Sequence, residues 1–112
     1  MNKELLCKIA DAIEAAPEEF DQAAWGTGCG TPRCVAGWAI TLCEDPDYCT
    51  GEDVADGARE VLGLTQYQRH NLFAANWPDW WVHGVFRGGY IQPTAEQAAY
   101  VLRELAAGRL EL

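Results

Sequence analysis

Residues 31–43, with the sequence TPRCVAGWAITLC, carry the strongest signals for the centre of the fold. Thr31 is suited to cap a helix, and Pro32 is accepted at the first helical position because the N–H that it lacks would have no partner there. Apolar side chains then cover almost the whole circumference, which is typical of a helix enclosed by others. Gly37 costs about 1 kcal/mol of helix propensity relative to alanine, so it indicates close packing against a neighbour. We therefore expect a buried central helix.

Helices are also predicted at both ends of the chain. Asn2 can cap a helix that runs to about Ala16 and is ended by Pro17, with a short helical turn after it. Thr94 and Gln97 form a capping box that opens a last helix. The apolar stripe of this last helix consists of Ala98, Val101, Leu102 and Leu105. Its spacing of three and four residues predicts one buried face.

A helical hairpin is predicted between these ends. Its first helix covers about residues 53–62, and Gly63 suits the left-handed position that follows a helix. Thr65 and Gln68 form another capping box, which opens a second helix through about Ala75. Together the signals predict a mainly α fold: a compact orthogonal bundle of about five helices, forming a single domain over residues 1–112. An aromatic, glycine-rich loop or short hairpin is expected just before the last helix.

The composition narrows the class of protein. Hydrophobic residues make up 49% of the 112 residues and charged residues 22%, which excludes a disordered chain. A net charge of -9 opposes approach to nucleic-acid phosphates and anionic lipid, and it favours basic protein partners. No apolar run approaches the roughly 18 residues that cross a membrane, and no secretory signal is visible. Because five cysteines are an odd number, they fit the reducing bacterial cytoplasm better than a closed disulfide framework.

One stretch also indicates a family. Residues 29–38 read C-G-T-x-x-C-x-A-G-W, and they are followed by LGLT at 62–65, LF at 72–73 and WP at 77–78. In this order of motifs the chain resembles a family of small proteins of unknown function found in actinobacteria and their phages. The resemblance implies a phage or mobile-element accessory protein that binds a host or defence protein. It implies no catalytic residues.

The cysteines support a different hypothesis, a metal centre. The candidate ligands are Cys29, Cys34, Cys43 and Cys49. Four thiolates can hold zinc tetrahedrally or anchor an iron–sulfur cluster, and His70 or His83 could replace one of them. Their C-x4-C-x8-C-x5-C spacing lacks the C-x2-C pair of common zinc sites. Free cysteine is also among the most buried residue types, so ordinary packing is the competing interpretation.

Two further functions are weighed against simple binding. Cys34 is expected near the third residue of its helix, where free amides and the helix dipole would lower the pKa of the thiol, as in a thiol enzyme. No asparagine or aspartate is clearly placed to orient a histidine beside it, so we favour a protein that is not an enzyme. The hairpin around Gly63 is similar to a DNA-binding helix-turn-helix. Its second helix offers Arg69, His70 and Asn71 on a strongly acidic protein, so a regulator is the weaker alternative.

Residues 77–90 contain the best candidate for a contact surface, because they combine aromatic side chains with glycines. Tryptophan, tyrosine and arginine dominate binding hot spots, and loops allow such residues to face outward. We expect a partner-binding patch made of Trp80, Trp81, Phe86, Arg87 and Tyr90. At least one tryptophan of this region is expected inside the fold and one outside. The sequence leaves monomer and homodimer open.

Overall fold

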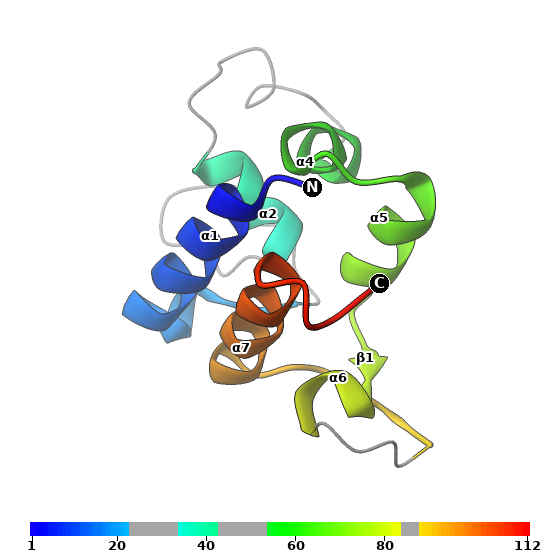
Figure 1. Cartoon of the computed structure of the whole chain (residues 1–112). Helices are drawn as coiled ribbons and strands as arrows, with labels where there is room; N and C mark the ends of the chain where they lie inside the picture. Colours follow the sequence, from blue (N-terminus) through cyan, green and yellow to red (C-terminus); the bar gives the residue numbers. More distant parts are fainter. Residues whose placement is uncertain (23–33, 43–53, 84–87) are drawn as a thin grey trace.

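The computed structural model describes residues 1–22, 34–42, 54–83 and 88–112 of the chain (Figure 1). These residues are mainly helical and share one hydrophobic core, which confirms the expected fold class. The elements in chain order are α1 (Lys3–Ala15), η1 (Pro17–Glu19), α2 (Val35–Thr41), α4 (Val54–Leu62), α5 (Gln66–Leu72), β1 (Trp77–Pro78), α6 (Asp79–His83), β2 (Tyr90–Ile91) and α7 (Ala95–Ala106). No helix in the described ranges is long and apolar enough to cross a membrane.

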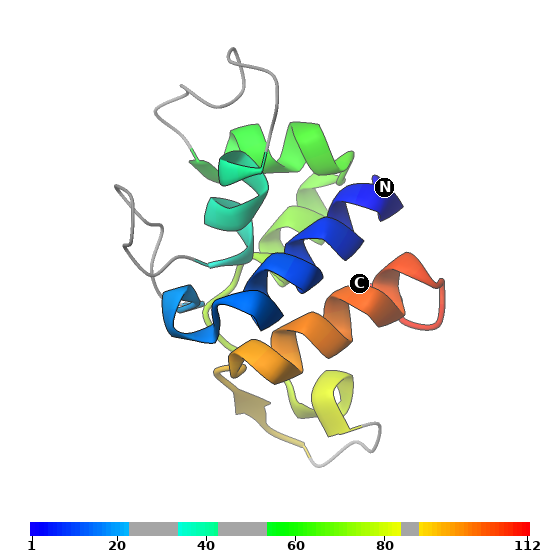
Figure 2. The same cartoon turned by 90° about the vertical axis from the view of Figure 1, so that its left-hand side faces the viewer.

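The first and last helices, α1 and α7, lie side by side and run in opposite directions (Figure 2). The predicted apolar stripe of α7 faces the core, since Ala98, Val101, Leu102 and Leu105 are all buried. On α1, the side chains of Leu6, Ile9 and Ile13 are fully buried as well. Each large aliphatic side chain buried in this way contributes about 1.5–3 kcal/mol. At the surface, the Arg103 guanidinium bridges the pair, with 2.8 Å to the Asp11 carboxylate and a second contact to Glu14. The buried apolar contacts between α1 and α7 therefore contribute most of the stability of this helix pair, because exposed ion pairs contribute little.

The central helix α2 is enclosed by its neighbours, as expected. Its first five residues, Val35, Ala36, Gly37, Trp38 and Ala39, are all buried. Its start differs from the prediction. The backbone of Cys34 is extended, with φ −77° and ψ −179°, so Cys34 occupies the N-cap position instead of lying inside the first turn of the helix. Thr31 and Pro32 lie outside the described residues.

Asn2 joins the start of α1 to the end of α4. Its side-chain Oδ1 accepts the Leu5 N–H at 3.1 Å, which is the predicted cap. Its backbone N–H donates to the Leu62 carbonyl at 2.6 Å, and its side-chain Nδ2 donates to the Val61 carbonyl at 3.2 Å. One residue thereby satisfies backbone groups at two helix ends that have no partner within their own helices.

The hairpin of α4 and α5 follows its predicted turn chemistry. Gly63 has φ +69°, and the Leu64 N–H donates to the Arg59 carbonyl at 3.0 Å, which closes α4 in a Schellman motif. Thr65 and Gln68 form the expected capping box at the start of α5. The helix ends at Leu72, three residues before the predicted end at Ala75.

The aromatic segment before α7 forms the short strand pair that was one of the two expectations. Strands β1 and β2 are antiparallel, with Trp77 opposite Ile91 and Pro78 opposite Tyr90. The short helix α6 follows β1 directly and was not predicted. The buried Asp79 fastens it, because its N–H donates to the Gly89 carbonyl at 3.0 Å and its Oδ2 accepts the Gly89 N–H at 3.3 Å. The start of α6 is therefore fixed beside β2.

Candidate binding groove

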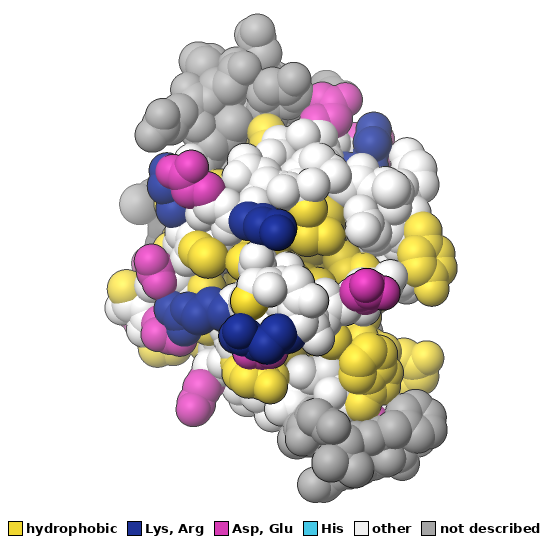
Figure 3. Space-filling view, viewed as in Figure 1, with side chains coloured by type: hydrophobic (Ala, Val, Ile, Leu, Met, Phe, Trp, Pro, Cys, Tyr) yellow, Lys and Arg dark blue, Asp and Glu magenta, His cyan; other side chains and the backbone are white. Residues whose placement is uncertain are grey.

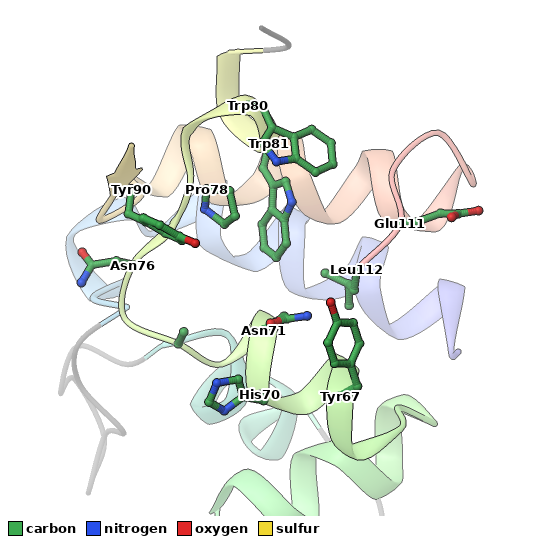
Figure 4. A pocket seen from close by; sticks show the side chains of 11 residues that line it. Tyr67, His70, Asn71, Asn76, Pro78, Trp80, Trp81, Tyr90, Glu111 and Leu112 are labelled. Atoms are coloured by element: carbon green, nitrogen blue, oxygen red, sulfur yellow. The ribbon is translucent and has the colours of Figure 1, made fainter. Parts of the chain in front are cut away.

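A groove of about 390 Å³ lies between α5 on one side and the β1–α6 segment with the C-terminal residues on the other (Figure 4). We call it the aromatic groove. It is lined by Tyr67, His70, Asn71, Ala74, Asn76, Pro78, Trp80, Trp81, Tyr90, Glu111 and Leu112. Hydrophobic side chains gather on this face of the molecule, with an acidic side chain between two groups of them (Figure 3).

Two tryptophans, Trp80 and Trp81, line one wall of the aromatic groove, and a third, Trp77, packs against Trp81. Trp77 is fully buried, and its indole N–H donates to the Leu72 carbonyl at the end of α5, at 3.0 Å. The Trp77 and Trp81 rings are tilted at 52° with centroids 5.6 Å apart, and Trp80 meets Trp81 edge to face at 86° and 6.3 Å. Such tilted and edge-to-face pairs are favourable beyond their buried area. The wall is therefore held in place before anything binds.

Gln22 fixes the base of this wall from a distant part of the chain. Its side chain is only 3% exposed, and its Nε2 donates to the carbonyls of Leu72 at 3.0 Å and Ala74 at 2.9 Å. Its Oε1 accepts the Val35 N–H at 3.1 Å. These groups lie at the end of α5 and the start of α2, where helices leave backbone groups without partners. Sequence reasoning missed Gln22, because its partners are 13 or more residues away.

The rim of the groove is aromatic and open to solvent. Tyr67 on α5 is 69% exposed, Tyr90 on β2 is 75% exposed and Trp80 on α6 is 38% exposed. In Figure 4, Trp81 points into the groove, while Tyr67 rises toward Leu112 from the opposite side. Rigid amphipathic rings of this kind supply large contact area at little entropic cost.

The residues of the predicted contact patch differ in how exposed they are. Trp80 and Tyr90 are both exposed and line the same groove. Trp81 is only 4% exposed, because it packs between Trp77 and Trp80, so its main role is to support the wall. As expected, the region has tryptophans inside the fold and one outside. The predicted contacts Phe86 and Arg87 lie outside the described residues.

Sequence reasoning missed the other side of the groove. Tyr67, His70 and Asn71 come from α5, and Glu111 lies beyond the last helix. His70 and Asn71 had been considered as part of a DNA-reading helix, and His70 also as a spare metal ligand, whereas Tyr67 and Glu111 had been given no role. No local signal marks these residues in the sequence, because they meet the aromatic segment only in the folded chain.

Cys34 has the opposite electrostatics to those predicted for a nucleophile. It is 2% exposed, and desolvation raises the pKa of its thiol despite the nearby backbone amides of Gly37 and Ala36, which act to lower it. The reactive thiolate is therefore disfavoured. Cys29, Cys43 and Cys49 lie outside the described residues, and the described part of the chain contains no group of three metal-binding side chains.

The α4–α5 hairpin uses its arginines within the fold. The Nε of Arg69 on α5 lies 3.1 Å from the Asp56 carboxylate on α4. Arg59 donates from its guanidinium to the Leu64 carbonyl at 3.3 Å, which braces the turn between the helices. These contacts fit a structural role for the hairpin, whereas a reading helix needs its basic side chains directed toward DNA.

Comparison with models of protein families, with curated proteins and with solved structures finds no match to this chain. The similarity of residues 29–38 to actinobacterial and phage proteins thus remains an expectation from the sequence.

Proposed function

We propose that this chain is a small, non-enzymatic accessory protein of a phage or mobile element, which binds a host or defence protein in the bacterial cytoplasm. The observation that carries the binding role is the aromatic groove, a preformed hollow with exposed rings on its rim. The origin and the type of partner rest on the motif of residues 29–38. Trp80, Tyr90 and Tyr67 are the proposed contacts.

The groove supports binding in preference to catalysis. Its described lining residues include one histidine, His70, and one acidic side chain, Glu111, and among them there is no cysteine, serine or lysine that could act as a nucleophile. Its aromatic rings and its two amides, on Asn71 and Asn76, are the side chains that recognise a protein segment. Since Trp77 and Gln22 hold the wall rigid, little ordering entropy opposes binding.

Site-specific photocrosslinking tests this proposal. A benzophenone amino acid is introduced in place of Tyr90 or Tyr67, and the protein is irradiated in an actinobacterial lysate. Both positions are highly exposed, so the replacement leaves the core intact. We expect the same crosslinked protein from both positions, because the two side chains line one groove.

Tyr100 provides the matched control. It is an exposed tyrosine on α7 that does not line the groove, so the same replacement there should give no such crosslink. Trp80→Ala should abolish the crosslinks from Tyr90 and Tyr67 while the circular dichroism spectrum is unchanged. Equal crosslinking from Tyr100, or crosslinks that survive Trp80→Ala, would show that the groove is not the contact surface.

A further inference from the structure

The described lining of the aromatic groove favours a cation over an anion. Glu111 is its only aspartate or glutamate, and no lysine or arginine is among these lining residues. No hydrogen bond or ion pair within the described ranges engages the Glu111 carboxylate. The whole chain carries a net charge of -9. A cationic occupant is therefore favoured both by the local carboxylate and by the long-range field.

The two described arginines that lie nearest in sequence to groove residues are paired elsewhere. Arg69, beside His70 on α5, pairs with Asp56 at 3.1 Å. Arg109, which precedes Glu111 in the C-terminal segment, donates to both carboxylate oxygens of Glu104 at 2.8 and 2.9 Å. Neither side chain is a lining residue. Within the described ranges, therefore, no cation of the chain itself complements Glu111.

The aromatic side chains specify the kind of cation. The faces of tryptophan and tyrosine attract cations, and the planar guanidinium of arginine also stacks on such rings. Trp80 and Trp81 meet edge to face, which presents two differently oriented indoles on one side of the groove. Tyr67 and Tyr90 face this wall from the α5 and β2 sides (Figure 4). A flat, weakly hydrated guanidinium fits this surface better than a compact, strongly hydrated ammonium.

The remaining polar side chains of the groove can form hydrogen bonds with the peptide backbone on either side of a bound arginine. The side-chain amides of Asn71 and Asn76 line the groove, and no hydrogen bond within the described residues occupies them. Each amide can both donate and accept. A volume of about 390 Å³ also exceeds the needs of one side chain and accommodates flanking residues.

We propose that the aromatic groove binds an arginine-bearing peptide segment of the partner, with the guanidinium stacked among Trp80, Trp81 and the rim tyrosines, and with the exposed side chain of Glu111 at the edge of the groove attracting its charge. This inference rests on the proposed function and deepens it, because it names the chemistry of the partner segment. The binding is non-covalent and uses the fold as it stands.

The test is an NMR titration of the full chain with short synthetic peptides. The probe is an acetylated glycine pentapeptide with arginine at its centre, and matched peptides carry citrulline, lysine or glutamate instead. Citrulline keeps the shape of arginine but has no charge. We expect the arginine peptide to shift the indole N–H signals of Trp80 and Trp81, with a Kd on the order of 1 mM, and to bind about tenfold more tightly than the citrulline peptide. Glu111→Gln should weaken the arginine peptide severalfold.

Trp80→Ala should remove these shifts, and Tyr100→Ala, the control away from the groove, should keep them. If citrulline or glutamate binds the groove as well as arginine, the cation hypothesis is wrong while the groove remains a protein-binding site. If no peptide shifts the groove signals and the crosslinks of Tyr90 and Tyr67 are also absent, both proposals fail. A dimer in sedimentation that Trp80→Ala dissociates, without arginine binding, would identify a second copy of the chain as the occupant instead.

Discussion

Replacing Gln22 with alanine removes three hydrogen bonds that connect α2, α5 and the segment after α5. The Val35 N–H would lose its partner in a buried position, and the Ala74 carbonyl would lose a bond of 2.9 Å. The Leu72 carbonyl keeps the Trp77 indole N–H as a second partner, so it loses less. Each lost bond costs about 1 kcal/mol, and a buried group left without a partner costs about 1–3 kcal/mol. We therefore expect Gln22→Ala to lower the free energy of unfolding by about 3 kcal/mol.

Urea unfolding, followed by tryptophan fluorescence and circular dichroism together, measures this change. With a slope m of about 2 kcal/mol per M, the loss moves the midpoint down by about 1.5 M at unchanged slope. Gln92→Ala is the matched control, because Gln92 is exposed and bonds only Asp21 at the surface, at 3.1 Å. It should change stability by less than about 0.5 kcal/mol. A Gln22→Ala midpoint equal to that of Gln92→Ala would refute the role assigned to this side chain.

Two other predictions concern Trp81 and Cys34. Trp81→Ala removes a buried ring and should lower the free energy of unfolding, measured by thermal unfolding, by about 3–5 kcal/mol. Trp80→Ala removes a partly exposed ring and should lower it by about 1 kcal/mol. Equal losses of stability would contradict the difference in burial between the two rings. Because burial raises the pKa of the Cys34 thiol, iodoacetamide at neutral pH should modify the exposed Cys7 before Cys34, and mass spectrometry of digests checks the order of these two. Because the pKa of the Cys34 thiol is higher in the folded than in the unfolded chain, the free energy of unfolding should fall as the pH rises past the unfolded value of 9.0. Cys34→Ala should make this fall smaller. A fall of the same size in both proteins would argue against the burial of the thiol.

The parts of the fold that were predictable are those set by neighbouring residues. Asn2, Thr65 and Thr94 all cap helices as expected, because a cap joins groups only two or three residues apart. Gly63 has the expected left-handed backbone for the same reason. The bounds of α2 and α5 were less accurate, since their ends depend on partners elsewhere in the chain. For example, the Gln22 side chain bonds the Leu72 carbonyl at the end of α5 and the Val35 N–H at the start of α2.

The candidate site was predictable only on one side. Trp80 and Tyr90 belong to one aromatic segment, so composition was enough to select them. Tyr67 joins them only because the hairpin packs against that segment, and the sequence contains no local trace of such a contact. The burial of Trp81 likewise follows from Trp77, whose position is set by a hydrogen bond to the end of α5.

The pairing of α1 with α7 has a consequence for synthesis on the ribosome. The contact between Arg103 and Asp11 joins residues 92 positions apart, and the apolar seam beneath it has a similar separation. The part of the α1 surface that α7 covers therefore stays exposed until residues 95–106 have left the exit tunnel. Closing so long a loop is slow compared with forming local helices, so the nascent chain has a period in which chaperones can bind this face.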